Sequence, residues 1–192
     1  MPLVVNITGV ILAGGKSSRF GENKALAHFR GIPMIQRVIE SLRQLFPEIL
    51  LVTNSPGEYG ELGVPVVRDI VPDQGPLGGI VTAFQNTLND RIFVVGCDMP
   101  ALEPGPILRI LAEGGVADAG IPVHDGVREY LMALYSRRLL PRLACCLSEG
   151  KLSLRDFFDH LSNVAWVPVE GDSCFNVNTK KDLELLEERD AH

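Results

Sequence analysis

The feature that most constrains this chain is a glycine-rich loop that follows its first apolar run. The run Val10–Ala13 is continuous and apolar, which predicts a buried strand, and the pair Gly14–Gly15 ends it at once. Adjacent glycines let a backbone approach a ligand closely, and two nearby serines add hydrogen-bond donors. Lys16, Arg19 and Lys24 bring three cations into the same loop. The sequence therefore predicts an anion site suited to a polyphosphate at the end of a strand, with an ordinary Gly/Ser-rich turn as the alternative.

The spacing of this loop excludes two common phosphate-binding motifs. The P-loop pattern G-x-x-x-x-G-K-[ST] is absent, because Gly21 is followed by Glu22 and Lys24 by Ala25. The dinucleotide pattern G-x-G-x-x-G is absent as well. A phosphate site in this loop must therefore be built in another way.

Length and charge narrow the classes of function. The 192 residues suit one domain that spans 1–192, and the net charge of −6 argues against a nucleic-acid-binding protein, which usually carries a basic face. Residues 1–30 run against this balance, since they hold four Lys or Arg side chains and one acidic side chain. Such a local cationic patch suits a small anionic ligand.

The N-terminal apolar run does not have the pattern of a signal peptide or a membrane span. Asn6 and Thr8 interrupt it, no Lys or Arg precedes Lys16, and no apolar stretch in the chain approaches the roughly 18 residues of a span. We expect a cytoplasmic protein without a membrane partner. The cysteines lack C-x-x-C spacing, which argues against a zinc site or a disulfide framework and favours buried reduced thiols; they are Cys97, Cys145, Cys146 and Cys174.

Strand-like and helical patterns alternate along the chain. A helix is predicted from Pro33, because apolar residues from there to Phe46 share one face, and a second helix from Gly75 to about Leu88. This order predicts an α/β fold with a mostly parallel sheet. Trp166 is expected in the core rather than stacked on a ligand. The remaining predictions are strands over 49–52, 64–67, 92–97, 117–122, 128–135 and 164–169, and helices over 107–112, 139–147 and 154–161.

Two capping boxes predict where late helices begin. Ser153 stands three residues before Asp156, and Thr179 stands three residues before Asp182. In such a box the hydroxyl and the carboxylate satisfy backbone N–H groups of the first turn. We assign the box of Thr179 and Asp182 a purely structural role.

Polar residues stand where three predicted strands end. Asn54 follows the strand over 49–52, Asp69 follows the strand over 64–67, and Asp98 follows the strand over 92–97. In mostly parallel sheets, ligands bind outside the carboxyl ends of the strands. Mg²⁺ needs one or two carboxylates together with substrate phosphates and water, so Asp98 alone can serve as its protein ligand. The alternative is that these residues only form turns.

The segment 73–80 predicts a helix start that is open to a ligand. Gly75, Gly78 and Gly79 leave backbone amides uncovered, and Pro76 suits the first turn of a helix. A flat base or an anion can lie against such a terminus. Close packing of the helix on its neighbours is the alternative use of the same small residues.

Five motifs in order resemble those of the molybdenum cofactor guanylyltransferases. They are L-A-G-G-x-S-x-R-x-G-x-x-K at 12–24, G-P-L-x-G at 75–79, C-D-x-P at 97–100, A-L-Y at 133–135 and F-N-V-N-T at 175–179. The resemblance runs from Gly9 to Leu183 and implies a three-layer, Rossmann-like nucleotidyltransferase fold of the nucleotide-diphospho-sugar transferase type. The family usually has Met in place of Phe20, Asp in place of Asn23 and Pro in place of Tyr130.

The same resemblance implies a role for each matching residue. Arg19, Lys24 and Asp98 are the expected catalytic residues, with Mg²⁺ bound by Asp98. Asn176 and Asn178 are expected on the acceptor side of the site. The expected GTP-binding residues are Leu12, Ala13, Gly14, Gly15, Lys24, Asn54, Asp69, Gly75, Pro76, Leu77 and Asp98.

The activity that the resemblance implies is transfer of GMP from GTP to the terminal phosphate of molybdopterin or molybdenum cofactor, giving the guanine dinucleotide cofactor and pyrophosphate. An acceptor phosphate is already anionic at pH 7, so the reaction needs no general base and no Ser-His-Asp constellation. The expected partners are GTP and a molybdopterin-type cofactor, with other cofactor-biosynthesis proteins or recipient molybdoenzymes as further partners.

Two alternative functions stay open from the sequence. The first is a cytidylyltransferase that acts on the same cofactor or on a sugar or polyol phosphate; such relatives tend to carry L-A-A-G, and Gly14 after a single Ala13 favours the guanylyl branch. The second is a catalytically silent nucleotide-binding cofactor chaperone. The presence of Arg19, Lys24 and Asp98 together argues against it.

Overall fold

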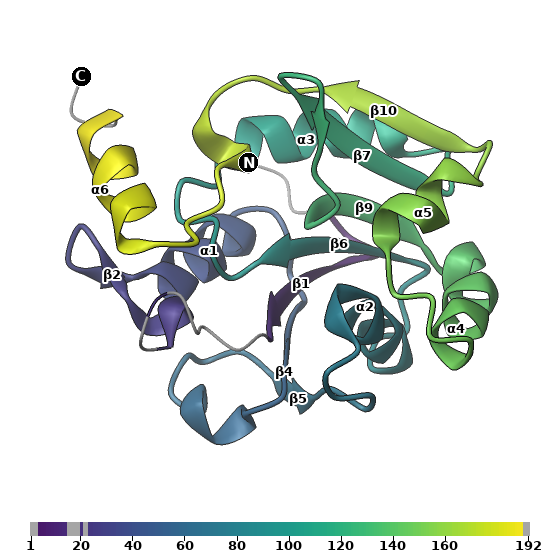
Figure 1. The fold of residues 1–192 in the computed structure, drawn as a ribbon, viewed down its shortest axis with the longest axis horizontal. Coiled ribbons are helices and arrows are strands. Elements are labelled where there is room, and N and C mark those ends of the chain that lie inside the picture. Colours follow the sequence, from purple (N-terminus) through teal and green to yellow (C-terminus); the bar gives the residue numbers. More distant parts are fainter. Residues whose placement is uncertain (1–3, 15–19, 21–22, 190–192) are drawn as a thin grey trace.

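The centre of the computed structural model, which describes residues 4–14, 20 and 23–189, is a mixed β-sheet (Figure 1). Its strand order is β10-β7-β9-β6-β1-β4-β5, and β8 pairs with β7. A separate hairpin joins β2 (His28–Phe29) to β3 (Ile32–Pro33). The strands of the main sheet are β1 (Ile7–Ala13), β4 (Ile49–Thr53), β5 (Val66–Arg68), β6 (Arg91–Gly96), β7 (Ala119–His124), β8 (Val127–Arg128), β9 (Met132–Ser136) and β10 (Val164–Pro168).

Most of the sheet is parallel, as the sequence predicts. β1 pairs in parallel with both β4 and β6, and β5 pairs in parallel with β4. β9 is the exception in the middle of the sheet, because it runs antiparallel to both β6 and β7. The carboxyl ends of β1, β4, β5 and β6 therefore lie at one edge of the sheet, and β9 begins at that same edge.

Helices cover both faces of the sheet and complete three layers (Figure 1). α1 (Met34–Arg43) and α3 (Pro104–Gly114) pack on one face, and α2 (Gly75–Gln85), α4 (Leu140–Ser148) and α5 (Leu154–Asp159) pack on the other. α6 (Lys180–Arg189) lies beside the β2–β3 hairpin, where Leu186 packs with Phe29. This three-layer architecture with a mostly parallel sheet is the predicted fold class.

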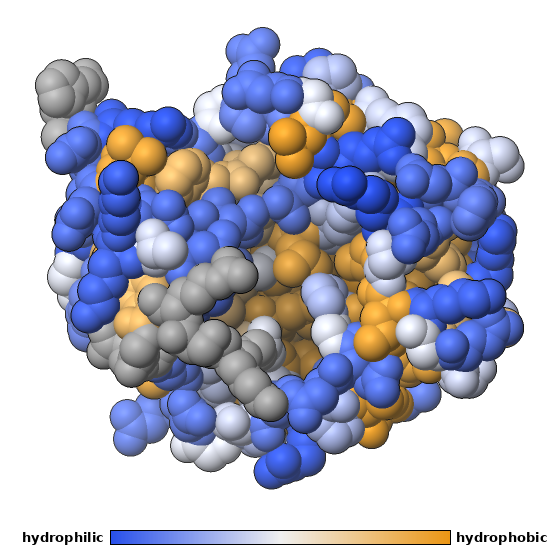
Figure 2. Space-filling model, viewed as in Figure 1, coloured by the Kyte–Doolittle hydropathy of each residue, from blue (hydrophilic) through white to orange (hydrophobic). Residues whose placement is uncertain are grey.

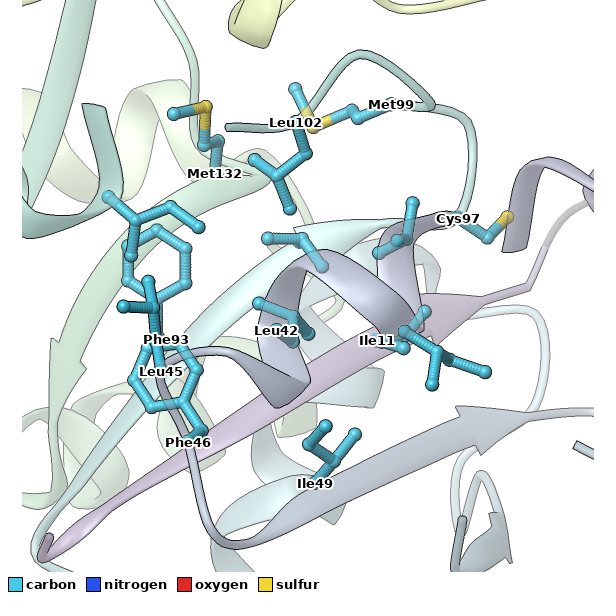
Figure 3. Packing of buried hydrophobic residues seen from close by; sticks show 14 of the residues in the cluster. Ile11, Leu42, Leu45, Phe46, Ile49, Phe93, Cys97, Met99, Leu102 and Met132 are labelled. Carbon is cyan, nitrogen blue, oxygen red and sulfur yellow. The ribbon is translucent and has the colours of Figure 1, made fainter. Parts of the chain in front are cut away.

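Alternate residues along the central strands supply two cores. Ile11 and Phe93 face α1, whereas Val10 and Val94 face α2. Figure 3 shows the core on the α1 side, in which Phe93 stacks on Phe46 with 5.7 Å between the ring centroids. Because both faces of these strands are buried, their sequences read as continuous apolar runs.

Both predicted caps are present in the structure. Ser153 Oγ accepts a hydrogen bond from the backbone N–H of Asp156 at 3.2 Å, so the cap of α5 is confirmed. Thr179 N–H donates to Asp182 Oδ2 at 2.7 Å and Asp182 N–H donates to Thr179 Oγ1 at 3.2 Å, which completes the box before α6. Each hydroxyl or carboxylate satisfies an N–H group that the first turn of a helix leaves without an internal partner.

The prediction that Trp166 belongs to the core is wrong. Trp166 lies on β10, which is an edge strand of the sheet, and its side chain is 38% exposed. The guanidinium carbon of Arg128 lies 4.2 Å from the centroid of its indole ring. An edge strand lacks a neighbour on one side, so a cation–π contact covers this ring instead of the apolar interior.

Two further predictions need correction. The range 128–135 is not one strand. Arg128 ends β8, which pairs with β7 across a tight turn in which Asp125 and Gly126 have positive φ angles of 49° and 77°, and β9 begins only at Met132. Among the cysteines, Cys97 is buried but Cys145 is exposed, although all four thiols are free as predicted. No helix in the described part of the chain combines the length and the apolarity that crossing a membrane requires.

Candidate nucleotide site

A cleft of about 490 Å³ opens at the edge of the sheet where the parallel strands end. Figure 2 shows this face hollowed near its middle, with apolar residues in the floor. Most of the residues that the sequence assigns to GTP binding line this cleft: Leu12, Gly14, Lys24, Asn54, Asp69, Gly75, Pro76 and Asp98. The sheet topology thus brings together side chains that lie up to 86 positions apart in the chain, from Leu12 to Asp98.

A lysine and an aspartate form an ion pair in the cleft. Asp98 follows β6, and Lys24 opens the short 3-10 helix η1 (Lys24–Leu26). Lys24 Nζ lies 2.5 Å from Asp98 Oδ2 and 3.1 Å from Asn178 Oδ1. The side chains of Lys24 and Asp98 are 22% and 14% exposed, so both can still be reached from the cleft. A cation beside a carboxylate can contact a phosphate and the metal that accompanies it.

Asn23 holds the loop that carries Lys24. Its Oδ1 accepts a hydrogen bond from Ala25 N–H at 3.1 Å, which caps η1. Its Nδ2 donates to Glu58 Oε2 at 2.6 Å and to Tyr59 Oη at 2.9 Å. Burial raises the pKa of the Tyr59 phenol, so this hydroxyl stays protonated at neutral pH. The amide thereby ties the lysine loop to the segment after β4.

The other two departures from the family pattern also have structural partners. Phe20 is 5% exposed and packs with Phe29 and Met34. The ring of Tyr130 stacks on Phe158 of α5, with 5.4 Å between the centroids. Both aromatic side chains therefore contribute to apolar packing around the site.

The absence of a side chain at Gly96 leaves room for the Asp98 carboxylate. A Cβ atom at position 96 would lie 2.4 Å from Asp98 Oδ1, closer than real Cβ contacts come. The carboxylate therefore folds back over the end of β6, into space that any other residue would fill. The sequence pattern of the strand did not indicate this use of a glycine.

Asn54 and Asp69 line the cleft next to each other along the sheet edge. Asp69 Oδ1 accepts hydrogen bonds from Thr82 Oγ1 at 2.7 Å and from Val71 N–H at 3.1 Å, so the turn-forming role weighed for this residue is present. Asn54 Oδ1 is buried and has no hydrogen-bond partner among the described residues. A buried acceptor without a partner costs free energy, and a ligand that donates a hydrogen bond would relieve that cost.

The start of α2 lines the cleft and also packs closely on the sheet. Gly75 has a φ of +63° and lines the cleft together with Pro76 and Gly79. A Cβ atom on Gly79 would lie 2.9 Å from Leu12 Cδ2, so this helix also packs closely on β1. The close packing brings the amino end of α2 to the cleft, where its N–H groups favour negative charge.

The connection between β8 and β9 meets the C-terminal motif on the other side of Asp98. Glu129 Oε1 accepts a hydrogen bond from Leu131 N–H at 2.9 Å, and Glu129 Oε2 accepts one from Asn176 Nδ2 at 2.7 Å. Burial raises the pKa of the Glu129 carboxyl, the two hydrogen bonds oppose that rise, and the nearby charge of Asp98 adds to it. The sequence reasoning did not single out Glu129.

The remaining predicted residues lie elsewhere. Leu77 is a residue of α2 whose side chain is fully buried against the sheet. The side chain of Ala13 is buried on the face of the sheet that α1 covers, and neither residue lines the cleft. Gly15 and Arg19 lie outside the described residues. Gly79, whose open backbone the sequence indicated, also lines the cleft. Further lining residues were not predicted, namely Val52, Thr53, Asp73, Gly96, Cys97 and Leu131. Their position at strand ends is the signal that could have found most of them.

A larger groove of about 620 Å³ lies between α4 and α5. Arg142, Cys145, Phe157 and His160 are among the residues that line it. It collects no residue from the ends of the parallel strands, where sheets of this class bind their ligands. We therefore assign the functional site to the smaller cleft around Asp98.

Together, the three-layer fold and the Lys24–Asp98 cleft define an α/β nucleotidyltransferase. Residues 9–164 match the family of MobA-like NTP transferase domains, and the chain belongs to this family. It is 37% identical over 189 residues to the probable molybdenum cofactor guanylyltransferase of Carboxydothermus hydrogenoformans, covering 94% of this chain and 95% of that protein. It is 34% identical over 194 residues to the probable molybdenum cofactor guanylyltransferase of Bacillus subtilis, covering 94% of each.

A solved structure agrees with these relationships. The crystal structure of molybdopterin-guanine dinucleotide biosynthesis protein A from Archaeoglobus fulgidus superposes with a TM-score of 0.81 at 25% identity, covering 96% of this chain and 98% of that one. The chain is therefore an enzyme of the nucleotidyltransferase class.

Proposed function

We propose that this enzyme transfers GMP from GTP to the terminal phosphate of molybdopterin or molybdenum cofactor and releases pyrophosphate. The observation that carries the proposal is the Lys24–Asp98 pair, which lies in a cleft with Asn54 and the amino end of α2. The names of relatives that are 37% and 34% identical over 94% of the chain support this choice of nucleotide and acceptor.

The cleft suits the charge changes of this reaction. An oxygen of the acceptor phosphate attacks the α-phosphorus of GTP, the bond from that phosphorus to the bridging oxygen breaks, and pyrophosphate leaves. The chain must align the two phosphates and neutralise their charge. The Lys24 ammonium would do the second task. Arg19 and the amides from Gly14 to Ser18 are expected to help; of these residues only Gly14 is among those that the structure describes.

We propose Mg²⁺ as the metal that Asp98 binds. The described residues contain no group of three or more His, Cys, Asp or Glu side chains that could hold a metal by themselves. Mg²⁺ is commonly held by one or two carboxylates with substrate phosphates and water, and Asp98 offers one carboxylate that is 14% exposed in the cleft. The donor set fits this metal, which when bound would neutralise charge on the phosphate under attack.

The part of the cleft that Asn54, Gly75 and Gly79 line suits the nucleoside. The buried Oδ1 of Asn54 offers an acceptor to a donor group of a ligand, and Gly75 and Gly79 leave the backbone uncovered beside it. A guanine base carries ring and amino N–H donors, which suits such an acceptor. Proteins that make or receive the cofactor are the further partners we propose, and the cytoplasmic location expected from the sequence remains a prediction.

Release of pyrophosphate tests the proposal. Purified enzyme is incubated with Mg²⁺, molybdopterin and one nucleoside triphosphate at a time. We expect release with GTP that depends on molybdopterin, and little release with CTP. A strong preference for CTP would establish the cytidylyl alternative, and the absence of release with every nucleotide would leave only a nucleotide-binding protein.

A further inference from the structure

The segment that follows η4 (Asp172–Cys174) lies beside the cleft in an alternating arrangement. Val177 N–H donates to the backbone oxygen of Asp98 at 2.9 Å, and the Val177 side chain is fully buried with Phe20 and Met34. Side chains on either side of such a residue in an extended segment point the opposite way. Asn178 follows this rule, because its Oδ1 lies 3.1 Å from Lys24 Nζ. Asn176 is thus directed to the same side as Asn178.

The hydrogen-bond acceptors around Asn176 allow only one of the two orientations of its side-chain amide. One of its two polar atoms lies 2.7 Å from Glu129 Oε2 and 3.4 Å from the backbone oxygen of Cys174. An ionised carboxylate and a carbonyl are both acceptors, so the atom between them must be the nitrogen. The orientation follows from the partners rather than from an assignment of nitrogen and oxygen positions. The carbonyl oxygen of Asn176 is then the group it can offer to a ligand.

Glu129 is itself held in place by hydrogen bonds to both of its carboxylate oxygens. Its second carboxylate oxygen accepts from Leu131 N–H at 2.9 Å, and Leu131 itself lines the cleft. Both oxygens of Glu129 are therefore engaged, one with the backbone of the cleft wall and one with Asn176. A carboxylate suits this place because it presents an acceptor on both sides, which no amide can do.

We propose that Glu129 is a positioning residue that holds the Asn176 amide with its carbonyl oxygen toward the acceptor substrate, where it accepts a hydrogen bond from an N–H group of a pterin-type ring. This inference rests on the proposed function and names a specificity determinant for its second substrate. Asn176 does not line the nucleotide cleft, so the contact is assigned to the acceptor and not to GTP. A ring with amino and ring N–H donors has the chemistry that a fixed carbonyl oxygen recognises.

The substitution Glu129→Gln tests this assignment with almost no change in shape. The introduced glutamine has one acceptor oxygen, and Leu131 N–H needs it, so the amino group of the glutamine would face the Asn176 amino group. Asn176 must then rotate or lose its partner, which removes the carbonyl oxygen from the acceptor side. We expect the KM for molybdopterin to rise by about 10-fold or more, since a donor of the substrate loses its acceptor, while the KM for GTP stays within about 2-fold.

A second substitution should reverse the effect. In Glu129→Gln/Asn176→Asp the amino group of the introduced glutamine can donate to one oxygen of the introduced aspartate, and the other oxygen of that carboxylate again faces the substrate as an acceptor. The net charge of the pair is unchanged from the native pair. We expect the KM for molybdopterin to return to within about 3-fold of the native value. Glu113→Gln is the matched control, because Glu113 is exposed and its partner is Arg109 on α3.

Two measurements decide the outcome. Initial rates are measured with GTP and molybdopterin varied in turn, and the side-chain ¹⁵N–¹H₂ signals of Asn176 are followed by NMR without substrates. A shifted Asn176 signal in Glu129→Gln, a selective rise in the molybdopterin KM and recovery in the double variant support the inference. Unchanged signals, equal rises in both KM values, or a double variant no better than the single one would overturn it. The NMR arm tests the amide even if the native enzyme releases no pyrophosphate, a result that would refute the proposed function itself.

Discussion

The nucleotide cleft and the proposed acceptor side next to it are built in different ways. On the nucleotide side, Asn54, Asp69 and Asp98 each follow a parallel strand, so the order of the sheet alone brings them to one edge. On the other side, Glu129 and Asn176 come from a strand connection and from a segment before α6, 47 positions apart, and they meet through side-chain hydrogen bonding. The nucleotide side is thus fixed by the sheet, whereas the other side depends on individual polar contacts.

Asp98 belongs to both sides, and changing it should have the largest effect. Asp98→Ala removes the carboxylate from Lys24 and from the proposed metal, but it leaves the backbone bond from Val177 N–H to Asp98 O in place. We expect turnover to fall by about 10³-fold, because charge neutralisation at the phosphates supplies most of the rate enhancement. Pyrophosphate release at saturating substrates measures it, and circular dichroism checks folding.

Asp159→Ala is the control for this variant. Asp159 pairs with Arg128 at 2.6 Å, and its side chain is 47% exposed and lies outside the cleft lining. Near-native turnover of Asp98→Ala would contradict the account, because catalysis would then not depend on this carboxylate or on a metal that it binds.

Gly96→Ala tests the nucleotide side without replacing a polar side chain. The added methyl group would lie 2.4 Å from Asp98 Oδ1, so the carboxylate must move from its place beside Lys24. We expect kcat/KM to fall by about 10- to 100-fold through this displacement. Steady-state kinetics with GTP measures the loss. Gly105→Ala should change nothing by comparison, since a Cβ atom there meets no other atom within 4 Å.

Asn23→Asp tests whether the nucleotide side also depends on a single polar contact, here the hydrogen bond from Asn23 to Glu58. The introduced aspartate would place a carboxylate where Asn23 Nδ2 now lies 2.6 Å from Glu58 Oε2. Like charges near the surface repel by about 1 kcal/mol, which corresponds to a rise of about 5-fold in the KM for GTP. Adding Glu58→Gln should restore the native KM. A double variant as weak as the single one would show that Asn23 acts in some other way.

The smallest effect is expected at Cys97, which lines the cleft next to Asp98. Burial raises the pKa of this thiol to about 12, and the neighbouring Asp98 charge adds to the rise. Because the thiolate forms only near that pKa, Cys97 stays protonated and unreactive throughout the neutral range. We expect iodoacetamide at pH 8 to leave turnover within about 2-fold of native while it labels the exposed Cys145 first. Loss of turnover together with labelling of Cys97, detected by mass spectrometry, would contradict this.

The same contrast explains what the sequence could predict. Asp98 and Asn54 follow continuous apolar runs, and a parallel sheet places the ends of such runs together, so local pattern was enough. Glu129 carried no such signal, because its place depends on β9 running antiparallel and on a bond to a distant asparagine. Trp166 was misplaced since strand pattern does not say which strand lies at the edge of a sheet. The role of Asn23 could not be predicted either, because its side-chain partners Glu58 and Tyr59 are distant in sequence and come near it only in the folded chain.

The central claim is that the acceptor attacks the α-phosphorus of GTP, and isotope transfer tests it most directly. The enzyme is incubated with Mg²⁺ and molybdopterin and with GTP labelled with ³²P at either the α or the γ position, and the products are separated by chromatography. We predict that the α label enters the pterin product and that the γ label appears in pyrophosphate. Transfer of the γ label to the pterin, or release of that label as inorganic phosphate, would contradict the account.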